Sequence, residues 1–344
     1  MPPPPPFVTV VVVNWNGLED TRACIRSLLA QTFEAREIVV VDNGSEGDDA
    51  DRIAAEFGDS IRLVRHADNR GFTGGNNAAM QLALDEGRSE FVALLNNDAE
   101  AEPDWLAALV RAASEAPDVA ACTSLMVFHA DPSVVENTGT EILATGEAVP
   151  RGRGRPAAEF ANHPADVLGA CGGAVLYRAS TLRRLGLFRD DFFANFEDVD
   201  LSLRIAAAGL RCRFVPGAVV RHRLNASIQK VRDDAFRIRS VRNLTLAVWG
   251  NLPWTTLVLN APALVVSHLL VPLVAPLLGQ WDLARILVRG RLAALRDIPS
   301  ARRAIRPHRR PVGLRLWWRQ RGFVGVYVRF VLDVVVRRRR RYME

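Results

Sequence analysis

The first hundred residues alternate between short apolar runs and segments whose apolar positions have helical spacing. Continuous runs rich in valine and leucine, each closed by turn residues, predict strands within residues 7–17, 37–45, 61–66 and 91–98. Apolar side chains three and four positions apart predict helices at residues 18–31, 76–86 and 103–116. Strands and helices in such short alternation predict an α/β fold, in which a parallel sheet carries helices on both faces.

The second half of the chain is less regular. We expect a mobile loop rich in Gly, Pro and Arg at 144–165, a helix at 198–209 and two short strands around Pro216–Gly217. From Asn243 to Trp281 the chain has 39 residues without Asp, Glu, Lys or Arg. The sequence therefore predicts three parts, which are a disordered lead at 1–6, an α/β domain at 7–242 and an apolar and basic helical region at 243–344.

The net charge of +6 hides a sharp division along the chain. Residues 1–200 carry 16 Arg against 32 Asp and Glu, a balance of −16, whereas residues 201–344 carry 28 Lys and Arg against 6 Asp and Glu, a balance of +22. A basic half can serve nucleic acid or an anionic membrane surface. Because the basic residues flank the long apolar stretch, the membrane surface is favoured and no nucleic acid is expected.

The apolar stretch is longer than the roughly 20 residues that cross a bilayer. Its prolines argue against one straight helix, and they are Pro253, Pro262, Pro272 and Pro276. We therefore favour a peripheral or monotopic attachment at the cytoplasmic face of the membrane over a transmembrane segment. The alternative is an ordinary helical subdomain that packs on the α/β domain. The arginines expected to face anionic lipid are Arg302, Arg303, Arg306, Arg309, Arg310 and Arg337 to Arg341.

The cysteines and the start of the chain agree with a reducing compartment. Cys24, Cys122, Cys171 and Cys212 are scattered and form no C-x-x-C pair. Such cysteines predict buried thiols rather than disulfides. The segment MPPPPP lacks the basic and apolar regions of a signal peptide, so we expect a short lead there.

Acidic residues gather between Asp190 and Asp200. Glu197, Asp198 and Asp200 fall within four positions, directly before the predicted helix. Carboxylates that lie close together in a partly dry site raise each other's pKa. Such a cluster is typical of a general base or a metal site. The simpler alternative is that these residues only cap the helix. Ligands bind beyond the carboxyl ends of parallel strands, where the sequence also places Asn14, Asp42 and Asp98. These features suggest an enzyme that handles a phosphate-bearing substrate with a divalent cation.

Six segments follow one another in an order that resembles glycosyltransferase family 2: VVVVNWNG, VVVDNGS, NRGFTGGNN, LLNND, GACGGAVLYR and FEDVDLSLR. The nearest likeness is to bacterial rhamnosyltransferase-like members that build cell-surface polysaccharide, and it covers about residues 7–250. The resemblance implies a GT-A fold, a nucleotide-diphosphate sugar donor, a divalent cation (Mg²⁺ or Mn²⁺) and inversion at the anomeric carbon.

The resemblance also implies a metal site. Asp98 matches the last acidic position of the family's D-x-D motif, whereas the first position is Asn96 in this chain. His222 occupies the place where some members supply a histidine to the metal, and a structural histidine at a strand end is the open alternative. Because Mg²⁺ accepts one or two carboxylates and takes its other ligands from phosphate and water, one Asp is sufficient.

Catalytic roles follow from the same likeness. Asp198 matches the family's base, which takes the proton of the acceptor hydroxyl as that oxygen attacks the anomeric carbon. Glu197 is expected to orient the acceptor or the base, and Gly172 and Gly173 match a segment beside the acceptor. The positions that match the donor site are Asn14, Asp42, Arg70, Gly71, Gly75, Asn76 and Asn97.

The resulting hypothesis is a metal-dependent, inverting glycosyltransferase that moves a hexosyl group, with rhamnosyl as one candidate, to a glycan or polyprenyl-linked acceptor. A catalytically degenerate, membrane-attached scaffold that binds nucleotide sugar is one alternative, because the first Asp of the metal motif is absent. Nucleotidyl transfer to a sugar phosphate is another, but NWNGLED lacks the Gly-rich basic loop typical of that class.

Overall fold

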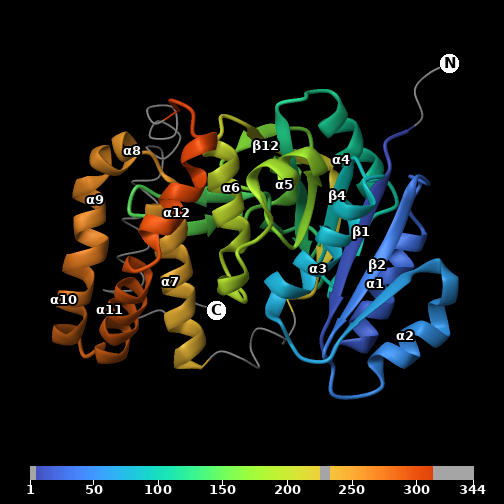
Figure 1. Cartoon of the computed structure of the whole chain (residues 1–344), viewed down its shortest axis with the longest axis horizontal. Coiled ribbons are helices and arrows are strands. Elements are labelled where there is room, and N and C mark those ends of the chain that lie inside the picture. The colour runs from blue at the N-terminus through green and yellow to red at the C-terminus, as the bar shows by residue number, and fades with distance from the viewer. Residues whose placement is uncertain (1–4, 225–232, 313–344) are drawn as a thin grey trace. The chain divides into compact units, whose positions relative to one another are not determined.

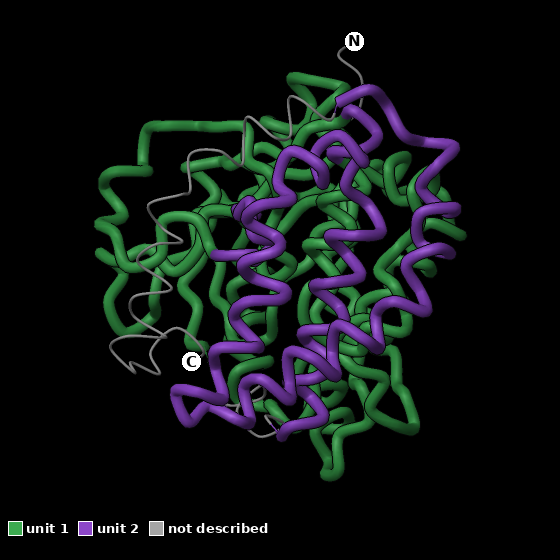
Figure 2. The backbone as a smooth tube through the Cα atoms, turned by 90° about the vertical axis from the view of Figure 1, so that its left-hand side faces the viewer, with its two compact units in different colours: residues 1–140, 150–205, 210–231 green, residues 141–149, 206–209, 232–344 purple. Residues whose placement is uncertain are grey.

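The computed structural model describes residues 5–224 and 233–312 (Figure 1). The chain divides into two compact units (Figure 2). The first unit comprises residues 1–140, 150–205 and 210–231, and the second comprises residues 141–149, 206–209 and 232–344. The second unit thus takes in two short pieces of the preceding chain in addition to the apolar and basic region.

The first unit is built on a ten-stranded sheet. Its amino-terminal strands run parallel, as the sequence predicts, and their order is β4-β1-β2-β3. They are β1 (Val8–Asn14), β2 (Arg36–Asn43), β3 (Arg62–His66) and β4 (Phe91–Leu95). Most side chains of β1, β2 and β4 are buried on both faces, which explains why their sequences are almost continuous runs of apolar residues.

The remaining strands make the sheet mixed. β11 (Ala174–Arg178) runs antiparallel between β4 and β6 (Val119–Phe128). β12 (Arg211–His222) lies on the other side of β6 and runs parallel to it. Three short strands complete the sheet, and they are β5 (Ala99–Ala101), β7 (Val135–Asn137) and β10 (Ala165–Val167). The predicted parallel arrangement therefore holds for the first four strands and does not extend to the whole sheet.

Helices cover both faces of the parallel strands. α1 (Leu18–Leu29), α2 (Asp49–Phe57) and α4 (Trp105–Ser114) share one hydrophobic core with alternate residues of the strands, such as Val10 and Val40. α3 (Gly71–Glu86) packs against β1 and β2 on the opposite face, where Val13 lies. The unit also contains α5 (Ala179–Leu185), and α6 (Glu197–Ala207) begins in it.

Three local predictions differ from the structure. β12 is one strand rather than two, with a register shift at Pro216–Gly217, because proline has no N–H to give to the strand ladder. α3 begins at Gly71 rather than at residue 76, so the glycine-rich residues 71–75 form its first turn. The predicted loop at 144–165 contains β9 (Ala148–Pro150), which pairs with β8 (Thr140–Ile142).

The second unit is helical. Its helices are α7 (Asp234–Asn251), α8 (Trp254–Leu259), α9 (Ala261–Val265), α10 (Val271–Val274), α11 (Trp281–Leu295) and α12 (Ile298–Ile305). Asp233 caps α7 by accepting a hydrogen bond from the backbone N–H of Phe236 (2.7 Å). A π-helical turn at Val266–Leu270 joins α9 to α10, and Pro262 and Pro272 stand in the first turns of these two helices. These elements and the 3-10 turn at Ala275–Leu278 follow one another without a break, so 261–278 is one helical segment that contains a π-helical turn, and Pro272 does not end it.

Two of the arginines predicted to face lipid have partners inside this unit. Arg302 donates to the carbonyl oxygen of Trp249 (2.6 Å), and Arg309 donates to that of Asn251 (3.2 Å). Both cations therefore cap the last turn of α7, where they complement the negative end of the helix dipole. These two residues thus have partners within the protein, and their contact with lipid stays a prediction. Arg303, Arg306 and Arg310 are exposed, and Arg337 to Arg341 lie outside the described residues.

Much of the apolar surface of the second unit is uncovered. Among the described residues, sixteen large apolar side chains are exposed, and fourteen of these lie between Trp254 and Leu295. In the same part of the chain one helical segment, Ala261–Leu278, is long and apolar enough to cross a membrane, and 22% of it is buried within the protein. The second unit therefore keeps many large apolar side chains exposed in this part of the chain.

Candidate active site

Side chains near the ends of the first two strands form one buried network. Asn14 and Asp42 face each other in register, and Asn14 Nδ2 donates to Asp42 Oδ1 (2.9 Å). Asn14 Oδ1 accepts from Thr21 Oγ1 (2.7 Å), which in turn accepts from Asn97 Nδ2 (3.1 Å). The network therefore ties three predicted donor positions together at the carboxyl edge of the sheet, where parallel sheets bind their ligands.

The loop before α3 is fixed by Asn43, the last residue of β2. Asn43 Nδ2 donates to the carbonyl oxygen of Gly71 (3.0 Å), and Asn43 Oδ1 accepts from the backbone N–H of Arg70 (3.2 Å). Gly71 has a φ of +71°, and a Cβ at this position would lie 2.3 Å from the carbonyl oxygen of Phe193. Only glycine fits there. The loop is thus shaped by main-chain contacts, and the guanidinium of Arg70 stays at the surface beside Asp68 (3.8 Å).

The first turns of α3 are already engaged with the protein. A Cβ at Gly75 would lie 2.7 Å from Val13 Cγ1, so this glycine lets the helix approach the sheet. Asn76 is buried and donates to a carbonyl oxygen within α3 (2.9 Å). The backbone N–H of Thr73 donates to the carbonyl oxygen of Phe193 (3.0 Å). Binding of the donor diphosphate at this turn stays a prediction.

Asp98 and His222 come together through strand pairing. β5 follows Asp98 directly and pairs antiparallel with the end of β12, which places Ala99 opposite His222. His222 Nε2 lies 3.0 Å from Asp98 Oδ1, and both side chains are largely buried. On its other side, His222 Nδ1 lies 3.3 Å from Glu136 Oε2. The imidazole thus bridges two carboxylates that come from distant parts of the chain.

The donor atoms of this group fit a divalent cation. Carboxylate oxygens and imidazole nitrogens are ligands of Mg²⁺ and Mn²⁺. Asp98 Oδ1 and His222 Nε2 lie 3.0 Å apart, at hydrogen-bond distance, and an ion would take the place of the proton between them. Within residues 5–224 and 233–312, no three or more His, Cys, Asp and Glu side chains are arranged to hold a metal ion, so an ion at this pair would need substrate phosphate and water as its remaining ligands.

The charge of His222 follows from the same contacts. Burial lowers the pKa of the imidazole, but the hydrogen bonds and negative charges of Asp98 and Glu136 outweigh burial and raise the pKa to about 10. At neutral pH the imidazole of His222 is therefore positively charged and lies between the carboxylates of Asp98 and Glu136.

Asp198 stands in the first turn of α6, with both oxygens held by the main chain. Its Oδ2 accepts from the backbone N–H of Gly172 (2.8 Å), and its Oδ1 accepts from the N–H of the following residue (2.7 Å). A Cβ at Gly172 would lie 3.2 Å from Asp198 Cβ, and one at Gly173 would lie 3.1 Å from Asn96 Nδ2. The glycine pair therefore lies between Asp198 and the loop that carries Asp98.

Glu197 is buried beside Asp198, and among the described residues its Oε2 has no hydrogen-bond partner. Burial, followed by the charge of Asp198, raises the pKa of Glu197 to about 8. Burial also raises the pKa of Asp198, against the opposing effect of the N–H groups. The preceding residues Phe193, Asn195 and Phe196 have φ values of 62°, 73° and 67°, a region that residues with a side chain seldom adopt. Backbone strain and raised carboxyl pKa values are both typical of functional sites.

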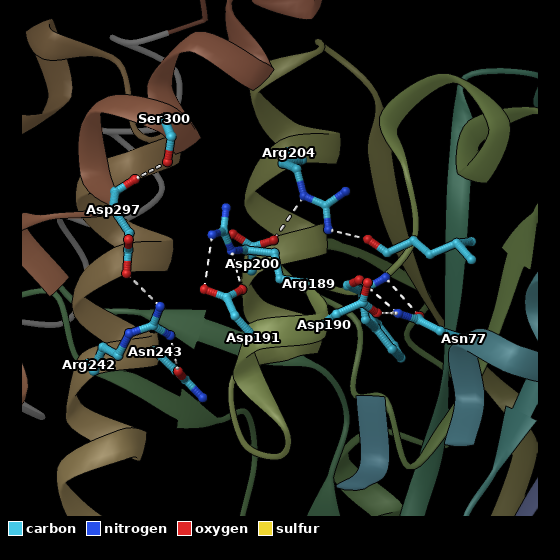
Figure 3. Close-up of polar contacts among 12 residues, drawn as sticks. Asn77, Arg189, Asp190, Asp191, Asp200, Arg204, Arg242, Asn243, Asp297 and Ser300 are labelled. Atoms are coloured by element: carbon cyan, nitrogen blue, oxygen red, sulfur yellow. Dashed lines mark hydrogen bonds and ion pairs between the residues drawn. The ribbon is translucent and has the colours of Figure 1, made fainter. Parts of the chain in front are cut away.

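The other acidic residues of this segment have structural partners (Figure 3). Three pairs account for them: Asp190 with Asn77 (2.6 Å), Asp191 with Arg189 (3.0 Å) and Asp200 with Arg204 (2.9 Å). Asp200 and Arg204 are four positions apart on α6, so Asp200 stabilises the helix through an ion pair within it, whereas the simpler alternative predicts a cap. Glu197 and Asp198 are the two that these pairs do not include.

Glu136 is the residue of this site that no motif in the sequence marks. Glu136 on β7 and His222 on β12 are brought near each other because both strands pair with β6, one on each side. Spacing along the chain does not reveal this pairing. Cys171, which precedes the glycine pair, lies close to both acidic centres. Burial and then the charges of Asp198 and Glu136 raise the pKa of its thiol well above the usual range. Cys24, Cys122 and Cys212 are buried, as predicted.

A family model described as glycosyl transferase family 2 matches residues 9–186, just over half of the chain. The matched region runs from β1 through α5 and contains the predicted donor positions, the glycine pair and Asp98. Asp198 and His222 lie beyond it.

Two curated relatives are similar over part of the chain. The uncharacterized protein y4gI of Sinorhizobium fredii is 30% identical over 237 residues, which are 64% of this chain and 25% of that protein. The glucosyl-dolichyl phosphate glucuronosyltransferase of Haloferax volcanii is 35% identical over 124 residues, which are 35% of this chain and 38% of that protein. These matches span less than half of the relatives' own length.

A solved structure shares the fold. The mannosyltransferase PcManGT from Pyrobaculum calidifontis, in complex with GDP-Man and Mn²⁺, superposes with a TM-score of 0.54 and 21% sequence identity. The superposition covers 89% of this chain and 87% of that one. At this identity the likeness establishes a shared GT-A type α/β fold and leaves the site to be argued from its own residues.

Proposed function

Since this chain belongs to glycosyl transferase family 2 and has a GT-A type fold, we propose that it transfers a hexosyl group from a nucleotide-diphosphate sugar to a glycan or lipid-linked acceptor, with inversion at the anomeric carbon. The observation that carries the proposal is the Gly172–Gly173 pair, with the carboxylate of Asp198 on one side and the loop of Asp98 on the other. Direct displacement at a sugar carbon needs a proton acceptor and a diphosphate-binding centre held at fixed positions around the substrate.

Asp198 acts as the base in this proposal. Burial raises its pKa above that of an exposed aspartate, and a base is most effective when its pKa approaches the working pH. The two backbone N–H groups fix the orientation of the carboxylate that would accept the proton of the acceptor hydroxyl. Glu197, with a pKa of about 8, is largely protonated at neutral pH and can donate a hydrogen bond to an acceptor oxygen.

Asp98 and His222 would hold Mg²⁺ or Mn²⁺. The bound ion would supply positive charge to the leaving diphosphate. Asn96 replaces the first acidic position of the metal motif, and its Nδ2 lies 3.3 Å from His222 Nε2. The histidine from β12 therefore stands beside the position that the missing carboxylate would occupy, which argues against the degenerate scaffold.

The donor side is assigned to the network at the ends of β1 and β2. Asp42 can accept from a base N–H or a ribose hydroxyl, while Asn14 and Asn97 hold it and the neighbouring loop in place. Arg70 is the exposed cation of the loop before α3 and is assigned to the diphosphate. Rhamnose as the transferred sugar, and cell-surface polysaccharide as the product, rest on the resemblance of the sequence motifs.

We place the protein at the cytoplasmic face of the membrane, attached through the second unit. The apolar residues exposed between Trp254 and Leu295 include a tryptophan near each end of Ala261–Leu278, where aromatic rings favour the headgroup region. The exposed arginines that follow complement anionic lipid. The relative from Haloferax volcanii is named for a dolichyl phosphate substrate, which agrees with a polyprenyl-linked acceptor.

The function is tested with the purified full chain and a panel of nucleotide sugars that includes UDP-glucose, GDP-mannose and dTDP-rhamnose. One donor should raise the melting temperature in the presence of Mn²⁺ and should be slowly hydrolysed, with water in place of the acceptor. NMR of the first sugar released should show the anomer opposite to that of the donor. Binding without any turnover would favour the scaffold, and retention of the anomeric configuration would contradict the proposed displacement.

Membrane attachment is tested by flotation with vesicles that contain phosphatidylglycerol. Replacing Leu273 and Leu277, which are 68% and 84% exposed, by Glu should release the protein from the vesicles. Leu29→Glu is the matched control, since Leu29 is 40% exposed on α1 of the first unit. Equal binding of all three proteins would contradict the assignment, and tighter binding to an oligonucleotide at the same salt concentration would point to nucleic acid instead.

A further inference from the structure

Glu136 occupies an irregular position in the sheet. β7 pairs with β6 so that Val135 lies opposite Val127 and Asn137 lies opposite Met126. Two neighbouring residues of β6 therefore face three of β7, and Glu136 is the additional residue. Such a bulge turns a side chain away from the regular alternation of a strand. Here it accompanies a carboxylate that is almost wholly buried and ends 3.3 Å from His222 Nδ1.

The contact fixes the orientation of the His222 ring. Glu136 Oε2 lies 3.3 Å from Nδ1, and on the opposite side of the ring Nε2 lies 3.0 Å from Asp98 Oδ1. Because a carboxylate oxygen accepts from an N–H, Glu136 holds Nδ1–H on its side, and a cation bound at Nε2 would take the place of the Nε2 proton. A histidine that binds a metal through one nitrogen almost always donates its other N–H to a carboxylate, a carbonyl or water.

We propose that Glu136 is a positioning residue of the cation centre, which holds the Nδ1–H of His222 so that Nε2 is presented beside Asp98. The inference rests on the proposed function, because it concerns the cation that function requires. Burial supports it: a carboxylate in the interior is destabilising unless it is paired, and His222 is the partner that the structure gives it.

The test measures the affinity of the full chain for Mn²⁺ by electron paramagnetic resonance, with the ion alone and with UDP or GDP added. Glu136→Gln keeps the size of the side chain but presents an amide that can accept or donate, so the ring is no longer fixed. We expect its dissociation constant for Mn²⁺ to rise by about 10–100-fold. Glu147→Gln is the matched control, since Glu147 is also a poorly exposed carboxylate and bonds to Ser267 in the second unit (2.7 Å).

A double-mutant cycle separates positioning from a general structural role. In a His222→Gln background, Glu136→Gln should cause no further loss of Mn²⁺ affinity, because Glu136 acts through the imidazole. A Mn²⁺ affinity that Glu136→Gln leaves unchanged, or lowers equally in both backgrounds, would overturn the inference while the proposed function stands. If the wild-type chain binds no Mn²⁺ with or without nucleotide, both the inference and the metal dependence fail.

Discussion

The two acidic centres of the first unit use the same kinds of side chain in opposite electrostatic settings. At Asp98 the carboxylates meet an imidazole, and together they raise the pKa of His222 to about 10. At Asp198 two neighbouring carboxylates are buried together, and burial with the charge of Asp198 raises the pKa of Glu197 to about 8. The first centre is therefore suited to positive charge and the second to a proton. Surroundings, rather than residue type, decide the chemistry of each.

The largest effect is expected at Asp198, the residue that we propose as the base. Asp198→Asn keeps the shape of the side chain but cannot take a proton, so the rate of transfer should fall by about 10²–10⁴-fold. Donor binding should persist, because the network to which we assign the donor lies at the ends of β1 and β2. Steady-state transfer and donor-dependent thermal shift measure the two quantities. Asp191→Asn, at an exposed aspartate paired with Arg189, is the control, and equal rates for both variants would remove Asp198 from the mechanism.

A smaller effect is expected at the centre that holds charge. Asp98→Asn removes a ligand, and because loss of an outer partner already lowers metal affinity by about 10–100-fold, the loss here should be at least as large. Titration of Mn²⁺ in the presence of nucleotide checks it, with the exposed Asp59→Asn as the control. An unchanged Mn²⁺ titration would mean that Asp98 and His222 have a structural role only. The two centres would then not differ in the way described above.

The smallest effect concerns stability at the base centre. The folded chain binds the proton of Glu197 more tightly than the unfolded chain, whose pKa is near the usual 4.5. Stability from this group is therefore complete below about pH 4.5 and is lost as the pH rises to about 8. Glu197→Gln has no such proton, so its melting temperature should decline less across that interval. Each 1 kcal/mol corresponds to about 2–4 °C for domains of this size. Parallel melting curves of the two proteins would contradict the raised pKa.

Much of the first unit could be predicted because its determinants are local. The valine-rich runs specify buried strands, and their polar ends specify where Asn14 and Asp42 lie. The start of α3 differs from the prediction because it depends on the left-handed backbone of Gly71 and on the bond from the Thr73 N–H to the carbonyl oxygen of Phe193, far along the chain. Glycine-rich sequence alone is compatible with a loop or with a helix turn.

The candidate site was predicted in part, and the limit is again the distance along the chain. The motifs marked Asp98, Asp198 and His222, but the meeting of Asp98 with His222 depends on the pairing of β5 with β12. Glu136 belongs to no motif, and it reaches the site through a bulge in β7. Arg302 and Arg309 show the converse: a basic run that reads as a lipid-facing surface includes cations that cap a helix of their own unit.

A backbone N–H remains in place when the side chain of its residue is replaced, unless the new residue is proline. Because both oxygens of Asp198 rest on such donors, the side chains around them can be exchanged to accommodate a different acceptor while the carboxylate keeps its aim. In the proposed mechanism, replacement of residues around Asp198 would therefore be a route to new linkages that leaves the proton-accepting step in place.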